Sequence, residues 1–158
     1  MVAAENHPVE VRPAHVDEFE AVAGLRWHWE LENYPPPAIA RDTFTAHFAD
    51  WAREHTDSHR CMVAVRDREL IGMAWLAVFE RVPTPESPLR LTGDLQSVYL
   101  IPEARAGGIG SRLVTAVIEQ ARALDIQKIT VQSGTRAIPV YARNGFEASP
   151  KLLVADLT

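Results

Sequence analysis

A glycine-rich run, Arg105-Ala106-Gly107-Gly108-Ile109-Gly110, stands between a β-prone apolar segment and an amphipathic one. The preceding segment, residues 95–101, is typical of a strand and stops at Pro102, because proline interrupts strands. In the following segment apolar residues recur every three or four positions, at Leu113, Val117, Ile118, Ala121 and Leu124, which is the spacing of one helical face. A strand that turns through glycines into a helix presents free backbone N–H groups and the positive end of the helix dipole. The run therefore predicts a phosphate-binding turn.

The residues that follow the glycines disfavour two common phosphate-binding motifs. A P-loop requires lysine and then serine or threonine after its last glycine, but Ser111 and Arg112 follow here. A dinucleotide-binding fingerprint requires a third glycine where this chain has Leu113. A nucleotide triphosphatase is therefore disfavoured, and a nucleotide-binding module stays only as a remote alternative.

The pattern Arg105-x-x-Gly108-x-Gly110 resembles the acyl-CoA signature of the GNAT superfamily of N-acetyltransferases, which is Arg/Gln-x-x-Gly-x-Gly/Ala. Residues 98–103, with their Pro-Glu exit, look like the fourth strand of that family. Residues 137–146 resemble its Ala-x-x-x-Tyr-x-x-x-Gly-Phe segment. The resemblance is strong over residues 95–146 and holds only in general layout before them.

In the second of these segments a short helix is expected to carry Tyr141. Gly145 suits a left-handed residue after the helix end. Pro139 is tolerated only in the first helical turn, so the helix should begin near Arg136 or Ala137. The resemblance also departs from the family at one place, because Gly134 stands where the family often has a cofactor-contacting asparagine.

The resemblance implies direct transfer of acetyl from acetyl-CoA to a primary amine of a small molecule or peptide, within a ternary complex. The pyrophosphate is expected on the glycine run and the pantetheine arm beside the fourth strand, where the fourth and fifth strands splay apart. The residues expected to bind acetyl-CoA are Val98, Tyr99, Leu100, Arg105, Ala106, Gly107, Gly108, Ile109, Gly110 and Ser111. A group of arginines could receive the CoA phosphates: Arg90, Arg105, Arg112, Arg136 and Arg143. The alternative is a GNAT module that binds or senses acyl-CoA without turnover.

Tyr141 matches the family residue that protonates the departing thiolate. A phenol with a pKa of ~10 stays protonated at neutral pH and can donate to a thiolate with a pKa of ~8–9. The general base stays open among Glu30, Glu32, Asp94 and a water chain. The acceptor pocket is expected near the end of the first helix, where Trp27, Trp29 and Tyr34 could line it.

The order of expected elements favours an α+β fold in a single GNAT-type domain spanning residues 1–158. We expect a strand at residues 9–12, a helix from Val16 that ends at residues 34–37, and a helix over residues 42–54. A hairpin over residues 60–66 and 70–79, a proline-rich loop at 82–88, a strand at 126–132 and a closing strand at 151–157 complete the order. The sheet should be central, mixed and mostly antiparallel, with flanking helices.

The composition bounds the partners and the compartment. Hydrophobic residues make up 47% of the 158 residues, and the formal net charge of −5 disfavours binding to nucleic acid or an anionic membrane. No apolar run approaches the ~20 residues of a membrane helix, and residues 1–8 lack a secretory signal pattern. The single cysteine, Cys61, is expected in the core rather than as a nucleophile, and it favours a reducing, cytoplasmic location.

The six histidines predict no metal site. His47, His55 and His59 lie close in sequence, but their gaps of eight and four residues around a helix end lack a coherent metal geometry. The small-molecule partners that the GNAT resemblance implies are acetyl-CoA and an amine acceptor, and no metal is expected. The sequence leaves open whether the chain forms a homodimer.

Overall fold

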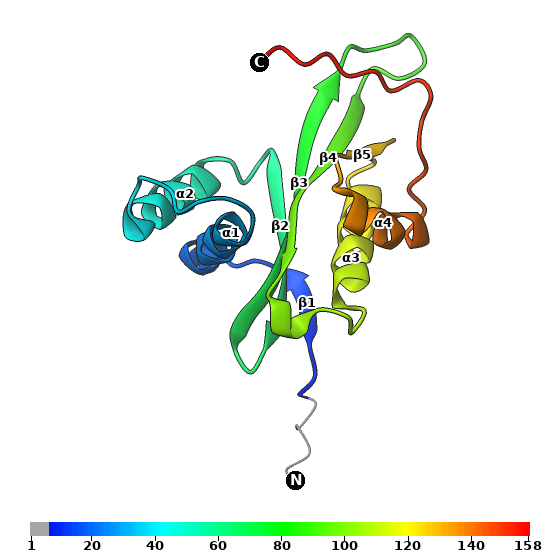
Figure 1. The fold of residues 1–158 in the computed structure, drawn as a ribbon. Helices are drawn as coiled ribbons and strands as arrows, with labels where there is room; N and C mark the ends of the chain where they lie inside the picture. Colours follow the sequence, from blue (N-terminus) through cyan, green and yellow to red (C-terminus); the bar gives the residue numbers. More distant parts are fainter. Residues whose placement is uncertain (1–6) are drawn as a thin grey trace.

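The computed structural model describes residues 7–158, which form a five-stranded sheet with helices on both faces. The strands follow in chain order across the sheet: β1 (Glu10–Pro13), β2 (His59–Arg66), β3 (Glu69–Arg81), β4 (Arg90–Leu100) and β5 (Ile129–Val131). The helices are α1 (Phe19–Asn33), α2 (Arg41–Glu54), α3 (Ile109–Ala123) and α4 (Ile138–Arg143). Figure 1 shows α1 and α2 on one side of the sheet and α3 and α4 on the other. This is the α+β architecture that the sequence predicts.

Two separate hydrophobic clusters fill the spaces between the sheet and its helices. Because strand side chains alternate between faces, neighbouring residues of β3 enter different clusters. Met73 and Trp75 pack with α1 and α2, whereas Leu76 packs with Leu113 and Val117 of α3. Each of these five side chains is at most 4% exposed. Burial of this extent, at about 25 cal/mol per Å² of apolar surface, holds both helical layers on the sheet.

The hairpin of β2 and β3 confirms the prediction for this part of the chain. Its turn residues, Asp67 and Arg68, both have positive φ angles, 50° and 67°. Two consecutive left-handed residues are the signature of the tight turn whose twist suits two antiparallel strands. The first four strands are antiparallel throughout, and only β5 runs parallel to its neighbour β4.

A β-bulge interrupts β4 in its second half. Met73 is opposite Tyr99 and Trp75 is opposite Gln96, so that Ser97 and Val98 together face one residue of β3. Ser97 adopts a positive φ of 50° at this point. On the other side of β4, pairing with β5 covers only residues 93–95. Beyond residue 95 the two strands part, which confirms the expected splay between the fourth and fifth strands.

The prediction of a closing strand at residues 151–157 is wrong. The segment is extended but forms no strand, and the hydrogen bonds within residues 147–158 are all local. Leu153 and Leu157 are 88% and 94% exposed. Extended propensity makes a strand only where a neighbouring edge supplies backbone partners. The strand expected at residues 126–132 is likewise shorter, because only Ile129–Val131 pairs with β4.

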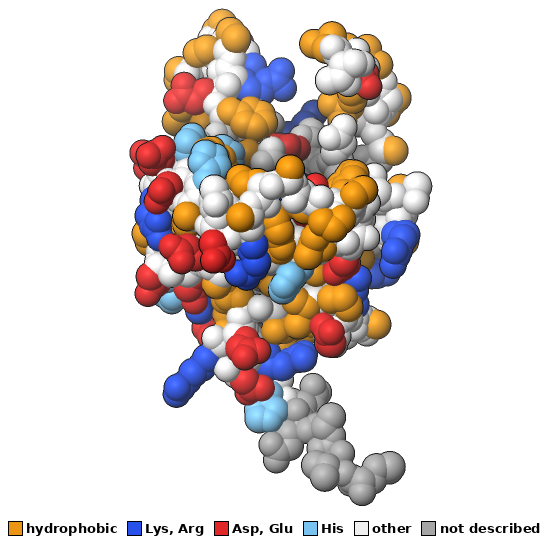
Figure 2. Space-filling view, turned by 60° about the vertical axis from the view of Figure 1, so that its left-hand side comes forward, with side chains coloured by type: hydrophobic (Ala, Val, Ile, Leu, Met, Phe, Trp, Pro, Cys, Tyr) orange, Lys and Arg blue, Asp and Glu red, His pale blue; other side chains and the backbone are white. Residues whose placement is uncertain are grey.

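The tail and the β3–β4 hairpin lie at the same end of the molecule. Figure 1 shows the tail, in red, running from α4 toward the end that carries this hairpin. Figure 2 shows two projections at that end, separated by a deep hollow and rich in hydrophobic side chains. Among residues 7–158 no helix is both long and apolar enough to span a membrane. The N-terminal stretch in which the sequence predicts no secretory signal lies mostly outside these residues.

Candidate functional site

The glycine run forms an open turn that leads into α3. Gly108, with φ of 78°, directly precedes the helix, and Ala106 is also left-handed, with φ of 66°. A Cβ atom built at Gly107 or Gly108 would meet nothing within 4 Å. The Arg112 N–H donates to the Gly108 carbonyl at 3.1 Å and closes the first helical turn. The N–H groups before it have no intrahelical partner, so this turn suits an anion that approaches the backbone closely.

The second half of β4 lies beside this turn. Gly110 allows the close approach, because a Cβ atom built there would lie 3.5 Å from the side chain of Leu100. Val98 and Leu100 are half-buried and border the gap that opens beyond residue 95. Within the described chain no strand covers this edge of residues 96–100, so a ligand can lie along it, although the Leu100 carbonyl already accepts a hydrogen bond from Arg105 Nε.

Tyr141 lies on α4, on the same face of the sheet as α3. Its ring is 8% exposed and packs edge-on against Phe146, with the centroids 5.6 Å apart. Burial raises the pKa of the Tyr141 hydroxyl, which keeps it protonated over a wider pH range. No other group in residues 7–158 hydrogen-bonds to this hydroxyl, which leaves it available as a donor. As predicted, Pro139 occupies the first turn of the helix and Gly145 is left-handed, with φ of 88°.

Asn144 fixes α4 against α3. Its side-chain N–H₂ donates to Ser111 Oγ and to the Val140 carbonyl, both at 2.8 Å. Its side-chain oxygen accepts a hydrogen bond from Thr115 Oγ1, also at 2.8 Å. The helix that carries Tyr141 is thereby tied to the first two turns of α3, next to the glycine run.

On the other face of the sheet, Glu32 joins the end of α1 to β4 and the glycine run. The Tyr99 hydroxyl donates to one oxygen of Glu32, and Arg105 Nη2 lies 2.7 Å from the other. Arg105 Nε also donates to the Leu100 carbonyl at 3.0 Å. Desolvation opposes ionisation of Glu32, but the hydrogen bonds from Tyr99 and Arg105 outweigh it and lower its pKa. The side chains of Tyr99 and Arg105 are therefore held by Glu32 of α1.

The other acids considered as a base have different neighbours. Glu30 lies 4.0 Å from Arg26 on the same helix. Asp94 accepts hydrogen bonds from Gln96 Nε2 at 2.9 Å and from Thr130 Oγ1 at 3.0 Å. The three candidate acids thus occupy three different places on one side of the sheet.

The structure does not bring the five arginines together. Arg90 lies at the start of β4, the full length of that strand from the glycine run, and donates to the Val82 carbonyl at 2.9 Å. Arg112 turns toward β1 and donates to the Val9 carbonyl at 2.8 Å. Arg136 and Arg143 are exposed on and beside α4. Gly134 precedes the short 3₁₀ turn before α4, and the Ser133 hydroxyl donates to its carbonyl at 2.7 Å.

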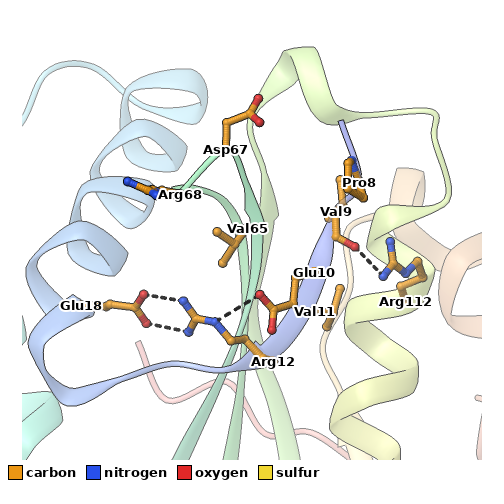
Figure 3. Close-up of a pocket in the computed structure, with 10 residues that line it drawn as sticks. All are labelled: Pro8, Val9, Glu10, Val11, Arg12, Glu18, Val65, Asp67, Arg68 and Arg112. Atoms are coloured by element: carbon orange, nitrogen blue, oxygen red, sulfur yellow. Dashed lines mark hydrogen bonds and ion pairs between the residues drawn. The ribbon is translucent and has the colours of Figure 1, made fainter. Parts of the chain in front are cut away.

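A cavity of about 770 Å³ lies elsewhere, at β1 and the β2–β3 turn. Figure 3 shows that its walls carry charges of both signs, with Glu18 bridging Arg12 through two hydrogen bonds. Of the residues predicted to bind phosphate, only Arg112 borders it. This cavity is therefore distinct from the gap beside β4: it carries balanced charges, and Tyr141 does not line it.

A smaller cavity, of about 90 Å³, lies beside the bulge and was not predicted from the sequence. Its walls come from α2, β2, β3 and β4: Phe48, Trp51, His59, Trp75, Gln96 and Ser97. The expected aromatic residues lie apart from it, with Trp27 against Phe44 and Trp29 against Tyr34. The lining residues do not form a sequence motif, because they meet only when β2, β3 and β4 pair and α2 packs on them.

Cys61 is 7% exposed, and burial raises the pKa of its thiol, so it packs in the core as the sequence predicts. No group of three or more His, Cys, Asp or Glu side chains within residues 7–158 could hold a metal ion. The described residues beside β4 present backbone N–H and C=O groups, the Tyr141 phenol and the side chains around the bulge.

Known proteins with the same fold include acetyltransferases. A predicted acetyltransferase from Clostridium acetobutylicum, solved with acetyl-CoA, superposes with a TM-score of 0.76 at 20% identity, covering 95% of this chain and 97% of that one. A GCN5-related N-acetyltransferase from Ralstonia eutropha JMP134 gives 0.72 at 23% identity, covering 96% and 100%. At these identities the likeness shows the fold.

Sequence comparison gives a relative and a family. Glucosamine 6-phosphate N-acetyltransferase from Trypanosoma brucei brucei is 28% identical over 68 residues, which are 43% of this chain and 46% of the relative. The match thus spans about half the length of that relative. The model of the acetyltransferase (GNAT) family matches residues 22–146. Because this match covers well over half of the sequence and includes both the glycine run and Tyr141, the chain belongs to the acetyltransferase (GNAT) family.

Proposed function

We propose that this GNAT domain is an N-acetyltransferase that transfers acetyl from acetyl-CoA to a primary amine by direct attack in a ternary complex. The observation that carries the proposal is the gap beyond residue 95 of β4. It has the open glycine turn at one end and Tyr141 on the α3 face. A cytoplasmic location is part of this proposal, supported by the single cysteine, which is buried and unpaired.

Acetyl-CoA is proposed to bind along this gap. The backbone N–H groups from Arg105 to Ser111 would hold the pyrophosphate, supported by the positive end of the α3 dipole. The pantetheine arm would pair with the backbone of residues 98–100, as an added strand does. The thioester is then held at the bulge, between the two faces of the sheet.

The reaction needs one proton donor and one proton acceptor. The neutral amine attacks the thioester carbonyl, a C–N bond forms, the C–S bond breaks and the thiolate leaves. Tyr141 donates its proton to that thiolate, which its buried, protonated hydroxyl is suited to do. The amine nitrogen loses one proton to a base, and the products are the N-acetyl compound and free CoA.

The proposal is tested by two measurements on the native chain. Acetyl-CoA should raise the melting temperature, and free CoA should appear when primary amines are added. Stabilisation by acetyl-CoA without CoA release from any amine would favour the alternative, a module that binds acyl-CoA without turnover. Stabilisation by ATP or NAD but not by acetyl-CoA would overturn the assignment of the site.

The role of Tyr141 is tested by Tyr141→Phe, which keeps the ring against Phe146 and removes only the hydroxyl. We expect the single-turnover rate of CoA release to fall by roughly 10²-fold, the usual scale of positioned acid catalysis, with little change in the Kd of acetyl-CoA. A wild-type single-turnover rate in the folded variant would show that Tyr141 serves packing alone.

A further inference from the structure

The small cavity beside the bulge, which we call the aromatic cavity, lies at the junction of α2, β2, β3 and β4. It lies on the α2 face of the sheet, the face opposite to Tyr141 and α3. Ser97, the left-handed bulge residue, is part of its wall. Gln96 stands directly opposite Trp75 on the neighbouring strand, so both side chains project from the same face of the sheet. The cavity thus borders the place where β4 leaves β5.

The walls of the aromatic cavity carry no acidic or basic side chain other than His59, and they suit an amino group better than an anion. Phe48, Trp51 and Trp75 have ring centroids 5.7 to 6.1 Å apart. The faces of such rings attract an ammonium group. The lining contains neither lysine nor arginine, so a phosphate or carboxylate would lose its hydration there without gaining a counter-charge.

His59 is the titratable side chain of this lining. Ser58 Oγ lies 2.8 Å from His59 Nδ1 and 3.4 Å from the His55 carbonyl. We assign the tautomer in which the serine hydroxyl donates to the carbonyl and accepts from Nδ1–H, because it satisfies both contacts; in this tautomer His59 Nε2 is an acceptor. Burial and then the nearby His55 lower the pKa of His59, so the neutral ring predominates at pH 7.

His59 is the residue able to take a proton in this cavity, because the titratable groups near it are already hydrogen-bonded. Trp51 packs against its ring at 4.9 Å, and His55, at the end of α2, lies 5.9 Å away, stacked on the same tryptophan. The nitrogen His55 Nδ1 is 2.7 Å from the Trp51 carbonyl, to which it donates. Asp94, on the same side of β4, is engaged by Gln96 and Thr130.

We propose that the aromatic cavity binds the reacting amino group of the acceptor and that His59 Nε2 takes the proton of the attacking nitrogen. This inference rests on the proposed acetyl transfer. The cavity, of about 90 Å³, is open on one side, so it can take the amino group of a ligand whose remainder extends outward. The acceptor of this proposal is a primary amine without phosphate or carboxylate near its reacting end.

The chemical steps balance. An arriving ammonium group loses one proton to His59 Nε2, which releases it to solvent. The neutral amine then attacks the thioester carbon, and the same nitrogen of His59 accepts the second proton as the C–N bond forms. The C–S bond breaks, and the thiolate takes its proton from Tyr141, on the opposite face of the sheet. Solvent exchange returns Tyr141 and His59 to their starting states.

An acceptor panel tests the substrate class. CoA release is measured with propylamine, phosphoethanolamine and glucosamine 6-phosphate, the last being the substrate in the name of the Trypanosoma brucei brucei relative. We expect kcat/KM for propylamine to exceed the values for both phosphorylated amines by at least tenfold. A higher kcat/KM for either phosphorylated amine would overturn the assignment of acceptor class.

Substitution of His59 tests the proton acceptor. In His59→Gln we expect kcat/KM with propylamine to fall about 100-fold at pH 7, the usual scale for loss of a positioned base. The loss should shrink as the pH approaches the pKa of the free amine, ~10, because the neutral amine then forms without help. The matched control is His47→Gln on the exposed side of α2, which should stay within about twofold of the native value. A loss that is the same at every pH would show that His59 only supports the structure.

Failure of this inference differs from failure of the proposed function. If no amine releases CoA, the acetyltransferase proposal fails, and the inference fails with it. If CoA is released but His59→Gln behaves as His47→Gln does, only the role of His59 fails. Quenching of tryptophan fluorescence by propylamine reports binding without turnover, because Trp51 and Trp75 line the cavity. Equal quenching by phosphoethanolamine would overturn the proposed selectivity for amines without phosphate.

Discussion

Replacing Gly108 by glutamate should separate cofactor binding from folding. Gly108 is left-handed, with φ of 78°, and a Cβ atom there meets nothing within 4 Å. The folded state therefore loses only the conformational penalty of a side chain in this region, roughly 1–2 kcal/mol. A bound pyrophosphate adds a second cost, because a carboxylate ~6 Å from one phosphate charge is repelled by about 2.8 kcal/mol at an effective dielectric constant of ~20.

This repulsion corresponds to a loss of at least ~100-fold in acetyl-CoA affinity, before any steric exclusion. The matched control is Gly145→Glu, since Gly145 has φ of 88° and equally open surroundings but follows α4 and is not part of the glycine run. Both variants should lose similar stability, and only Gly108→Glu should lose affinity. Gly108→Gln isolates the steric part, because it has no charge.

The assay is calorimetric titration with acetyl-CoA at two salt concentrations, with thermal unfolding of each variant in parallel. Higher salt should reduce the loss in Gly108→Glu, because salt screens charges exposed to solvent. If folded Gly108→Glu binds acetyl-CoA with the native Kd, the pyrophosphate does not lie on this turn and the assignment of the glycine run is refuted.

Two further substitutions test how the site is supported and how the fold depends on pH. Asn144→Ala removes the hydrogen bonds that link α4 to α3. We expect kcat to fall about tenfold, because Tyr141 loses its fixed position, and the free energy of unfolding to fall by about 1–2 kcal/mol. The control, Asn33→Ala at the end of α1, should leave kcat unchanged in the same assay. The hydrogen bonds from Arg12 lower the pKa of Glu18 from 4.5 to about 2, so its ionised form stabilises the folded state above pH ~4.5, and this stabilisation disappears as the pH falls toward 2. Glu18→Gln should therefore cost about 1–2 kcal/mol in urea unfolding at pH 7 and almost nothing near pH 2, and a cost that is independent of pH would contradict this account.

The features predicted best from the sequence are those encoded locally. Pro102 ends β4 within two residues of the expected place, Pro139 begins α4 in its first turn, and Gly145 is left-handed after it. In each case the backbone restriction of one residue, proline or glycine, decides the local structure. The helix after the glycine run follows in the same way from the spacing of its apolar residues.

The features that were missed depend on contacts between distant segments. The bulge places a serine, Ser97, in a left-handed conformation for which its sequence gives no signal, since glycine or asparagine is the usual residue there. His59 and Trp75 meet beside Gln96 only because β2, β3 and β4 pair in this register. The prediction of a closing strand was wrong because residues 151–157 have a strand-like composition but no neighbouring strand to pair with.

The division of the interior into two clusters has an evolutionary consequence. No buried residue belongs to both the cluster beneath α3 and the cluster beneath α1 and α2, although the partly buried Ile101 packs against both. Substitutions in separate clusters without shared partners combine nearly additively, so a change on one side of the sheet leaves the other side's stability margin intact. Selection can then diversify Phe48 or Trp51, which recognise the incoming amine in our proposal, while Leu113 and Val117 keep the donor side constant. Such a partition lets one scaffold acquire new acceptors by neutral drift in a single layer.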